Sequence, residues 1–429
     1  MHPLIALPYA ASGALASVAC HLPLPGSGKA MRALRARRGV TERCEAWGRT
    51  ARDPARPLLW MHAPSVGEGL QARPVIQRLR AEHPDWQLVY TFYSPSAERF
   101  AASIGADFTD YIPFDTAKNA ERLLAALRPS AIIFAKLDLW PHLAERAAQR
   151  GVPLGMIAAT LAEGSGRRGV LARALLGDAY AALSAVGTIA EDDGERLAEL
   201  GVRRERIVVT GDTRYDQVHA RAAAVDRASA LLAPLMSARP TLVAGSTWPA
   251  DETPLRAAWR EVRGDAPDAR LMIAPHEPDR AHLEPIRAWA QEDGLSLATL
   301  GEADASHDLV LVDRVGVLGE LYALGTAAYV GGGFHAAGLH SVLEPAAFGM
   351  PVIFGPRHGS SRDAGLLLEC RGGFAAANAD ELARAIRIVL TESDTRARAG
   401  AAARALVIGG LGASERSAEL IEGMVLPQK

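Results

Sequence analysis

The chain has 429 residues, 49% of them hydrophobic, which is about twice the length that one hydrophobic core usually organises. We therefore expect two folded domains and exclude a chain that is disordered over most of its length. Lys and Arg total 47 against 49 for Asp and Glu, so a protein that wraps nucleic acid over its whole surface is also excluded.

The amino terminus is predicted to contact a membrane. Residues 4–22 are mostly apolar, but Pro8, Gly13 and many alanines make them a marginal spanning helix. Five basic residues follow, at Lys29, Arg32, Arg35, Arg37 and Arg38. A secretory signal would carry its positive charge before the apolar run, so export is not expected. Residues 1–50 are interpreted as a membrane-associated basic segment, interfacial or weakly inserted.

The basic cluster decides the expected orientation of this segment. Basic side chains stay on the cytoplasmic side and are attracted to anionic phospholipid, by about 1 kcal/mol for each one near the surface. The predicted location is therefore the cytoplasmic face of a membrane. The alternative is that residues 4–22 form an amphipathic helix packed on the first domain.

Residues 51–230 are predicted to form a first Rossmann-like domain, because short apolar runs alternate there with helical patterns. Strands are expected at Leu58–Ala63, Leu88–Phe92, Ala131–Ala135, Pro153–Ala158 and Ile207–Thr210. After Gly67, apolar residues recur at i, i+3, i+4 and i+7, which predicts an amphipathic helix. These residues are Ala72, Val75, Ile76 and Leu79.

Residues 240–410 show the same alternation of short apolar runs and helical patterns and are predicted to form a second Rossmann-like domain. Strands are expected at Leu242–Ala244, Leu271–Ala274, Leu309–Val312, Ala328–Val330 and Val352–Phe354. Helical spacing is found in Leu255, Ala258, Trp259 and Val262, and again in Leu382, Ala385, Ile386 and Val389. The Pro-containing stretch 231–240 is interpreted as the interdomain linker. Residues 411–429 are expected to form a C-terminal helix that packs back.

The fold class predicted is therefore α/β, with two doubly wound sheets whose strand ends face a common cleft. A nicotinamide-dependent dehydrogenase is excluded, because the first strand is followed by HAPSVGEG, which lacks the third glycine of the dinucleotide motif. The three cysteines, Cys20, Cys44 and Cys370, are far apart and lack ligand spacing. Neither a disulfide framework nor a structural zinc site is expected, and a reducing cytosol is favoured.

Two loops after predicted strands carry candidate site residues. Glu68 opens the helix after the first strand, where it is either a carboxylate that favours the first helical turn or a general base. Ser246 and Thr247 also stand between a strand and a helix, where amides and hydroxyls can hold a phosphate, although many such loops look alike.

The stretch 331–345 is a more specific signal. Its three glycines, the last of them Gly333, follow a strand and are expected to let a ligand approach the backbone closely. Glu344 opens the next helix, where its carboxylate can accept hydrogen bonds from both ribose hydroxyls of a nucleotide. Purely structural glycines would explain the turn, but not the polar groups that cluster in it.

Eight runs together resemble the 3-deoxy-D-manno-octulosonic acid (Kdo) transferase family. They occur in the family's order over about residues 57–390 and read WMHAPSVGEGLQARPVIQRLR, TFYSPSAERF, AIIFAKLDLWPHLAERA, GDTRYDQV, LVAGSTWPADE, IAPHEPDR, LGELYALGTAAYVGGGF and AGLHSVLEPAAFGMPVIFGPRH. The resemblance implies a GT-B glycosyltransferase that uses CMP-Kdo to modify the lipid A precursor, lipid IVA, in lipopolysaccharide biosynthesis. It implies that 51–230 bind the acceptor and 240–410 bind CMP-Kdo, and that the protein works at the cytoplasmic face of the inner membrane.

The resemblance also implies roles for particular residues. The family's general base falls on Glu68, and its CMP contacts fall on three short runs. These runs are Pro275 and His276; Leu318, Gly319 and Glu320; and Ser341, Val342, Leu343 and Glu344. Two places depart from the commonest form, because His276 stands where arginine is frequent and Ser341-Val342 where Asn-Pro is frequent. Backbone contacts would survive these changes.

A larger departure lies in AKLDLWPH, where the family usually has two glutamates and this chain has Lys136 and Asp138. Arg214 stands where lysine is usual. Cations here have a physical use, because the Kdo carboxylate, the leaving phosphate and the acceptor phosphates are all anionic. The alternative is that Lys136 and Asp138 merely pair with neighbours at the sheet edge.

The mechanism expected is a single inverting displacement. Glu68 deprotonates an acceptor hydroxyl that attacks the anomeric carbon of Kdo through a transition state with oxocarbenium character. Lys136, Arg214 and amides near Ser246 meet the leaving-group charge, so no metal or other cofactor is expected. The expected partners are CMP-Kdo, a lipid A precursor and an anionic membrane, and not nucleic acid.

Two other classes stay open at this point. A different nucleotide-sugar GT-B enzyme, such as a hexosaminyltransferase or a UDP-sugar epimerase, shares the fold and the ribose contact of Glu344, and protection by CMP but not UDP separates it from a Kdo transferase. A non-catalytic two-domain binding protein would bind sugar without turnover and would not need Glu68.

Overall fold

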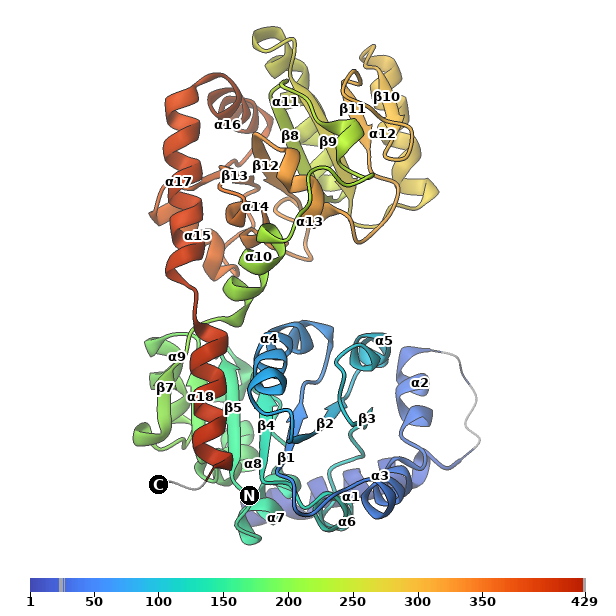
Figure 1. Ribbon diagram of the computed structural model, residues 1–429, viewed down its shortest axis with the longest axis vertical. Coiled ribbons are helices and arrows are strands. Elements are labelled where there is room, and N and C mark those ends of the chain that lie inside the picture. The colour runs from blue at the N-terminus through green and yellow to red at the C-terminus, as the bar shows by residue number, and fades with distance from the viewer. Residues whose placement is uncertain (23–25, 27, 427–429) are drawn as a thin grey trace. The chain divides into compact units, whose positions relative to one another are not determined.

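The computed structural model describes residues 1–22, 26 and 28–426. The chain divides into two compact units. The first contains Met1–Asp216 and the segment that starts at Leu411, and the second contains Gln217–Gly410. Each unit is an α/β domain with helices on both faces of its own seven-stranded parallel sheet (Figure 1).

The first unit has the strand order β3-β2-β1-β4-β5-β6-β7, in which the order reverses between β1 and β4. Its strands are β1 Leu58–His62, β2 Gln87–Phe92, β3 Phe108–Tyr111, β4 Ala131–Ala135, β5 Leu154–Ala159, β6 Ala185–Thr188 and β7 Ile207–Val209. Its helices are α1 Pro3–Ala19, α2 Lys29–Ala36, α3 Val40–Thr50, α4 Val66–Glu82, α5 Glu98–Ala102, α6 Ala117–Leu127, α7 Pro141–Gln149, α8 Val170–Ala181, α9 Glu191–Glu199 and α18 Ala413–Val425.

The second unit has the strand order β10-β11-β9-β8-β12-β13-β14, which reverses between β8 and β12. Its strands are β8 Thr241–Thr247, β9 Arg270–Pro275, β10 Leu297–Thr299, β11 Leu309–Leu311, β12 Ala327–Val330, β13 Val352–Phe354 and β14 Gly373–Ala375. Its helices are α11 Pro249–Asp265, α12 Arg280–Glu292, α13 Leu318–Leu321, α14 Leu343–Ala347, α15 Arg362–Glu369, α16 Ala379–Thr391 and α17 Ser393–Gly409. Helix α10, Thr213–Ala223, contains the boundary between the units.

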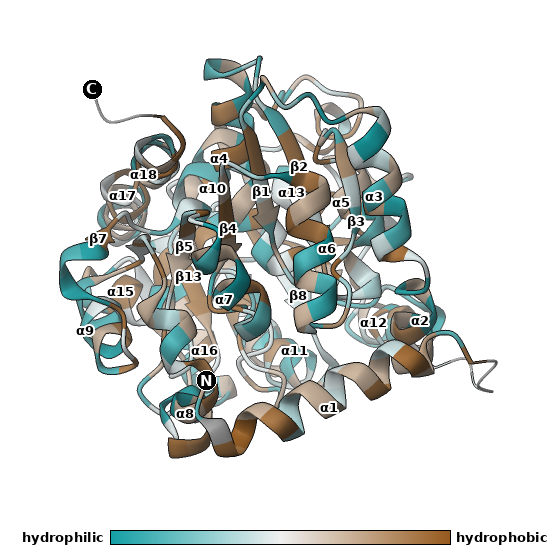
Figure 2. Cartoon of the chain, turned by 90° about the horizontal axis from the view of Figure 1, so that it is seen from below, coloured by the Kyte–Doolittle hydropathy of each residue, from teal (hydrophilic) through white to brown (hydrophobic). Residues whose placement is uncertain are grey.

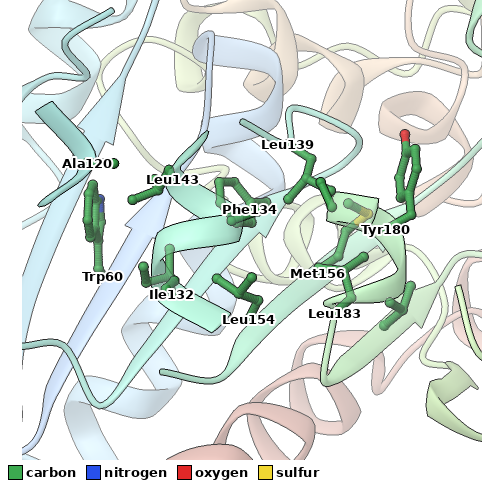
Figure 3. Packing of buried hydrophobic residues seen from close by; sticks show 14 of the residues in the cluster. Trp60, Ala120, Ile132, Phe134, Leu139, Leu143, Leu154, Met156, Tyr180 and Leu183 are labelled. Atoms are coloured by element: carbon green, nitrogen blue, oxygen red, sulfur yellow. The ribbon is translucent and has the colours of Figure 1, made fainter. Parts of the chain in front are cut away.

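All ten strands predicted from the sequence are present. Except for β7, which is exposed at the sheet edge, they are buried, and parallel strands covered on both faces read as continuous apolar runs. In the first unit, alternate side chains of the central strands enter two different cores. Trp60, Ile132 and Phe134 pack with Leu143 of α7 on one face (Figure 3), and Met61 and Ile133 pack with α4 and α18 on the other. Four short strands, β3, β6, β10 and β14, were not predicted.

The boundary between the units differs from the one expected at residues 231–240. Leu232 and Leu235 in that stretch are buried in a core of the second unit, and Arg270 donates to the carbonyl of Leu235 at 2.8 Å. The stretch is therefore part of the second unit, because its leucines supply core contacts that a linker would lack. The expected C-terminal helix forms as α18 and packs on α4 of the first unit.

Helix α1 is attached to the first unit, as in the alternative of a packed helix. The Tyr9 hydroxyl donates to Asp115 at 2.9 Å, and the amide of His2 donates to Ala174 at 2.8 Å. Figure 2 shows α1 as a largely hydrophobic rod whose first turn lies beside α8. No helix among the described residues combines the length and apolarity that crossing a bilayer requires.

Candidate active site

Glu68 and Lys136 form an ion pair at the carboxyl edge of the first sheet. Ser65 caps α4 directly after β1, and its hydroxyl hydrogen-bonds the Glu68 carboxylate one turn later. Lys136 follows β4, and its Nζ lies 3.6 Å from Oε1 of Glu68. Both side chains are partly exposed, at 35% for Lys136 and 20% for Glu68. The pair therefore places a carboxylate beside an amino group at a position that is open to a ligand.

Lys136 has a left-handed backbone conformation, with φ +60°. A residue with a Cβ is uncommon there and costs about 1 kcal/mol or more, so such positions cluster at functional sites. The amide of Lys136 donates to Ile157 at 2.9 Å, which holds this turn against β5. The strain indicates that the turn is kept because it places the Lys136 side chain at the sheet edge.

Asp138 pairs with His62 rather than with Lys136. Its Oδ2 accepts from His62 Nε2 at 2.9 Å and from Trp140 Nε1 at 3.1 Å. His62 is fully buried at the end of β1, and its Nδ1 lies 2.9 Å from the Thr91 hydroxyl. Burial raises the pKa of Asp138, but the hydrogen bond and charge of His62 outweigh it, so the net pKa is below the ordinary value. Sequence reasoning missed His62, whose only signal was a histidine inside an apolar strand.

Arg214 lies at the start of α10 and forms an ion pair with Asp212. Its Nε and Nη2 lie 2.8 and 2.6 Å from Oδ2 of the buried Asp212, and its backbone amide donates to Oδ1 at 2.9 Å. Gln71 of α4 contacts the same carboxylate at 3.4 Å. Asp212 therefore holds the Arg214 guanidinium in place. Gln71, which contacts the same carboxylate, follows Glu68 by about one helical turn in α4.

In the second unit, the predicted phosphate loop and the three-glycine loop are bound to each other. Ser246 has a left-handed φ of +54°, and the Thr247 hydroxyl donates to Glu252 at 2.9 Å. The fully buried Asp251 accepts from the amides of Gly332 at 2.8 Å and Phe334 at 3.1 Å. The carboxylate thus joins α11 to the loop after β12.

The prediction that the glycines admit a ligand is not supported by their contacts. A Cβ at Gly331 would lie 2.7 Å from the carbonyl carbon of Ser246, and one at Gly333 would lie 2.5 Å from Cα of Gly355. The space beside these glycines is filled by neighbouring backbone, because three loops meet there. Their absent side chains therefore serve packing within the protein.

Glu344 lines a cavity of about 380 Å³ within the second unit, together with two of the predicted CMP contacts, Gly319 and Glu320. The other lining residues are Val218, Arg221, Ala222, Ala224, Val225, Asp226, Ser229 and Phe348. Burial raises the pKa of Glu344, and the charge of Arg221 opposes that shift. Arg221 was missed from the sequence, because α10 precedes the stretch interpreted as a linker.

The remaining predicted contacts fall into two groups. Val342 and Leu343 are buried in the core, so only their backbone is available to a ligand, whereas Ser341 is exposed. Pro275 ends β9 and is buried, while His276 is exposed and stacks on Trp248 with ring centroids 4.6 Å apart. Leu318 begins α13, ahead of Gly319 and Glu320.

One group of side chains in the described part of the chain has the spacing of a metal site, Glu277, Asp279 and His282. Asp279 caps α12, accepting from the amide of His282 at 3.1 Å and lying 2.8 Å from its Nδ1. Helix capping explains this contact, and the carboxylates are exposed, so we do not assign them as ligands.

Residues 33–217 match the family model described as 3-Deoxy-D-manno-octulosonic-acid transferase (kdotransferase). The chain is 26% identical over 393 residues to the 3-deoxy-D-manno-octulosonic acid transferase of Haemophilus influenzae, covering 90% of this chain and 92% of that protein. It is 28% identical over 399 residues to the transferase of the same name from Bordetella pertussis, covering 87% and 89%.

Solved structures agree on the fold. The UDP-GlcNAc 2-epimerase of Neisseria meningitidis bound to UDP-GlcNAc aligns with a TM-score of 0.64 at 14% identity, covering 86% of this chain and 100% of that one. The UDP-GlcNAc 2-epimerase of Methanocaldococcus jannaschii aligns at 0.56 and 15%, covering 82% and 98%. At these identities the likeness to the solved structures concerns the GT-B fold alone. The relatives matched in sequence are Kdo transferases, so the chain is similar in sequence to that family of glycosyltransferases over most of its length.

Proposed function

We propose that this protein transfers Kdo from CMP-Kdo to a lipid A precursor, with Glu68 as the general base. The observation that carries the proposal is the Glu68–Lys136 pair, which lies inside the residues that match the family model. Glu68 takes the proton of a primary hydroxyl on the acceptor glucosamine. The freed oxygen attacks the anomeric carbon of Kdo, and the bond from that carbon to the phosphate oxygen breaks, releasing CMP with inversion.

Lys136 has an electrostatic role in this proposal. A carboxylate adjoins the anomeric carbon of Kdo, and negative charge develops on the departing phosphate. An ammonium placed before reaction stabilises that charge at little reorganisation cost, and removing one such group typically lowers turnover by about 100-fold or more. Lys136 and Arg214 supply fixed cations, so we propose that the reaction needs no metal ion.

The second unit is proposed to hold the CMP moiety. The cavity beside Glu344, Gly319 and Glu320 has the size expected of a small-ligand site. The carboxylate of Glu344 accepts the two ribose hydroxyls in this proposal, as the family resemblance implies. The loops that follow β8 and β12 contribute backbone amides to the phosphate.

We propose that the first unit attaches to the membrane at its cytoplasmic face through α1. Four large apolar side chains on α1 are exposed, at 81% for Leu4, 78% for Leu7, 71% for Leu15 and 61% for Val18. Val170 and Leu171 at the start of α8 are exposed at 84% and 76%. The turn at 166–168, which directly precedes α8, carries Arg167 and Arg168, and exposed apolar groups beside basic side chains suit insertion into an anionic interface.

One of the five basic residues that were predicted to face lipid does not serve this surface. Arg37 is buried, donates to the carbonyl of Tyr93 at 2.8 Å and lies 3.9 Å above the Tyr93 ring. Arg32, Arg35 and Arg38 are exposed. The side chain of Lys29 lies outside the described residues.

Nucleotide choice and product mass test the proposal together. The purified chain should be protected against thermal unfolding by CMP and not by UDP, and with CMP-Kdo and a lipid A precursor it should yield a product heavier by Kdo. Added EDTA should leave the rate unchanged. Protection by UDP alone, with no Kdo transfer, would instead favour the UDP-GlcNAc 2-epimerases that share the fold.

A further inference from the structure

Helix α1 packs closely against the loop between β3 and α6. Gly13 is at the point of contact, because a Cβ there would lie 3.0 Å from the carbonyl oxygen of Asp115 and 3.2 Å from Cγ2 of Thr116. Glycine is disfavoured in the interior of a helix, so a glycine at this position fits a need for close approach to backbone. The contact between α1 and this loop is therefore specific.

Tyr9, one turn before Gly13 on α1, binds the side chain of the same aspartate. Its hydroxyl donates to Oδ2 of Asp115 at 2.9 Å. Asp115 is buried, so loss of this donor would leave a buried carboxylate with one hydrogen bond fewer. The Tyr9 ring also packs on the ring of His142 in α7, with centroids 5.4 Å apart. One side chain of α1 thus contacts both Asp115 and α7.

Asp115 caps α7, whose own N-cap residue makes no capping hydrogen bond. That N-cap residue is Trp140. The Asp115 carboxylate instead accepts from two amides of the first turn, those of His142 at 2.8 Å and Leu143 at 3.0 Å. These amides have no partner within the helix, and a negative charge is favoured at this end of the helix dipole. Asp115 therefore determines where α7 begins.

The start of α7 is also the end of the loop that carries Lys136. This loop, residues 136–140, is held at three points. At its start, the amide of Lys136 donates to the carbonyl of Ile157 at 2.9 Å. In its middle, Asp138 is bound by the histidine that ends β1, and at its end Asp115 caps the helix that follows. The third point is the one to which α1 is attached.

We propose that Tyr9 is a positioning residue for Kdo transfer, which acts through Asp115 on the loop that places the Lys136 ammonium. The inference rests on the proposed function, because it takes Lys136 as a cation of that reaction. The backbone of Lys136 is strained, so the position of its side chain depends on how the loop is held. The helix that is proposed to enter the membrane therefore also contributes to the geometry of the active site.

Tyr9→Phe tests the proposal, because it removes the hydroxyl and keeps the ring against His142. With saturating acceptor dispersed in detergent, kcat should fall about tenfold, since a catalytic group displaced by about 1 Å can lose up to about 100-fold. KM for the acceptor and Kd for CMP should stay at the parental values. Ser12→Ala is the control, because it removes a hydroxyl that donates to the carbonyl of Tyr9 within α1, and it should keep the parental kcat.

Two further variants on α1 separate positioning from membrane binding. Gly13→Ala places a Cβ against Asp115 and should lower kcat in detergent, as Tyr9→Phe does. Leu7→Ser changes an exposed apolar side chain. It should raise KM for acceptor embedded in vesicles of phosphatidylcholine and phosphatidylglycerol, which is the pattern of weakened membrane binding.

A double-mutant cycle tests whether the effect of Tyr9 passes through Lys136. In the Lys136→Gly background, Tyr9→Phe should lower kcat no further, because the ammonium whose position it disturbs is already absent. Hydrogen exchange followed by mass spectrometry gives a readout that does not depend on activity. Tyr9→Phe should speed the exchange of peptides that cover residues 136–145 and not of those that cover β5.

The outcomes for this inference and for the proposed function are distinct. Three results would each overturn the positioning role and leave the transferase untouched: a parental kcat in Tyr9→Phe, unchanged exchange at residues 136–145, or a loss of kcat that is as large in the Lys136→Gly background as in the parent. Failure of the parent to transfer Kdo overturns the proposed function instead.

Discussion

The Arg221 guanidinium of α10 lies 3.1 Å from the Glu344 carboxylate, Nη1 to Oε1, within the second unit. A Cβ at Gly319 would lie 2.9 Å from Arg221 Nη2, so the guanidinium also covers Gly319. In the proposed function, Glu344 must give up this ion pair before it accepts ribose hydroxyls. Arg221 is thus a competitor of the nucleotide.

Replacing Arg221 with Gln should therefore tighten CMP binding. An exposed ion pair contributes up to about 1 kcal/mol, which corresponds to roughly a two- to fivefold lower Kd by calorimetry. Arg227→Gln, a change of an exposed arginine a few residues later, serves as the control and should have no effect. Weaker CMP binding by Arg221→Gln would mean that Arg221 contacts the nucleotide directly.

Lys136 permits a test that separates catalysis from folding. Because its φ is +60°, glycine fits this backbone position better than lysine does. Lys136→Gly should keep Tm at or above that of the parent while Kdo transfer falls by about 100-fold, and Lys136→Arg should keep part of the rate. Transfer by Lys136→Gly at the parental rate would remove the ammonium from the mechanism.

The Asp138–His62 contact predicts a dependence of stability on pH. The pKa of Asp138 is lower in the folded chain than in the unfolded one, so its stabilisation is present above the unfolded value of about 3.9 and is lost as pH falls through the folded value. Urea unfolding of the parent and Asp138→Asn should differ at pH 6, and the difference should shrink as the pH falls below the unfolded value. A difference that stays constant over this range would contradict the charged pairing.

Gly333 tests the packing role of the three-glycine loop. A Cβ there would meet the backbone of Gly355, so Gly333→Ala should destabilise the second unit by about 1–3 kcal/mol. Gly359→Ala is a matched control, since a Cβ at Gly359 has no atom within 4 Å. Thermal unfolding should show a lower Tm for Gly333→Ala only. Equal Tm values for the two variants would instead favour the prediction that the glycines let a ligand approach the backbone.

The sequence predicted the central strands well, because their side chains are buried on both faces. It missed β3, whose residues Phe108, Thr109 and Asp110 are only half-buried at the sheet edge, and the three-residue edge strands β10 and β14. These edge strands are short and lack the apolar run that identifies a strand, whereas the edge strand β7, whose residues are Ile207, Val208 and Val209, has such a run and was predicted.

The candidate site could be predicted only in part. Glu68 and Lys136 each follow a strand and were both identified, whereas the partner of Asp138 was not, since His62 lies 76 residues away in sequence. The packing role of the glycines was not predicted, because the atoms that fill the space beside them belong to other loops. Contacts of this kind depend on tertiary packing, which cannot be predicted from the local sequence pattern.

Kdo transfer by the Glu68→Gln variant is the most direct test of the central claim. The variant keeps the shape and polarity of the side chain but cannot accept a proton at neutral pH. With CMP-Kdo and a lipid A precursor, product mass spectrometry should show a rate at least 100-fold below the parent, while CMP binding and Tm are unchanged. Transfer within a few-fold of the parental rate by Glu68→Gln and Glu68→Ala would contradict the assignment of Glu68 as the base.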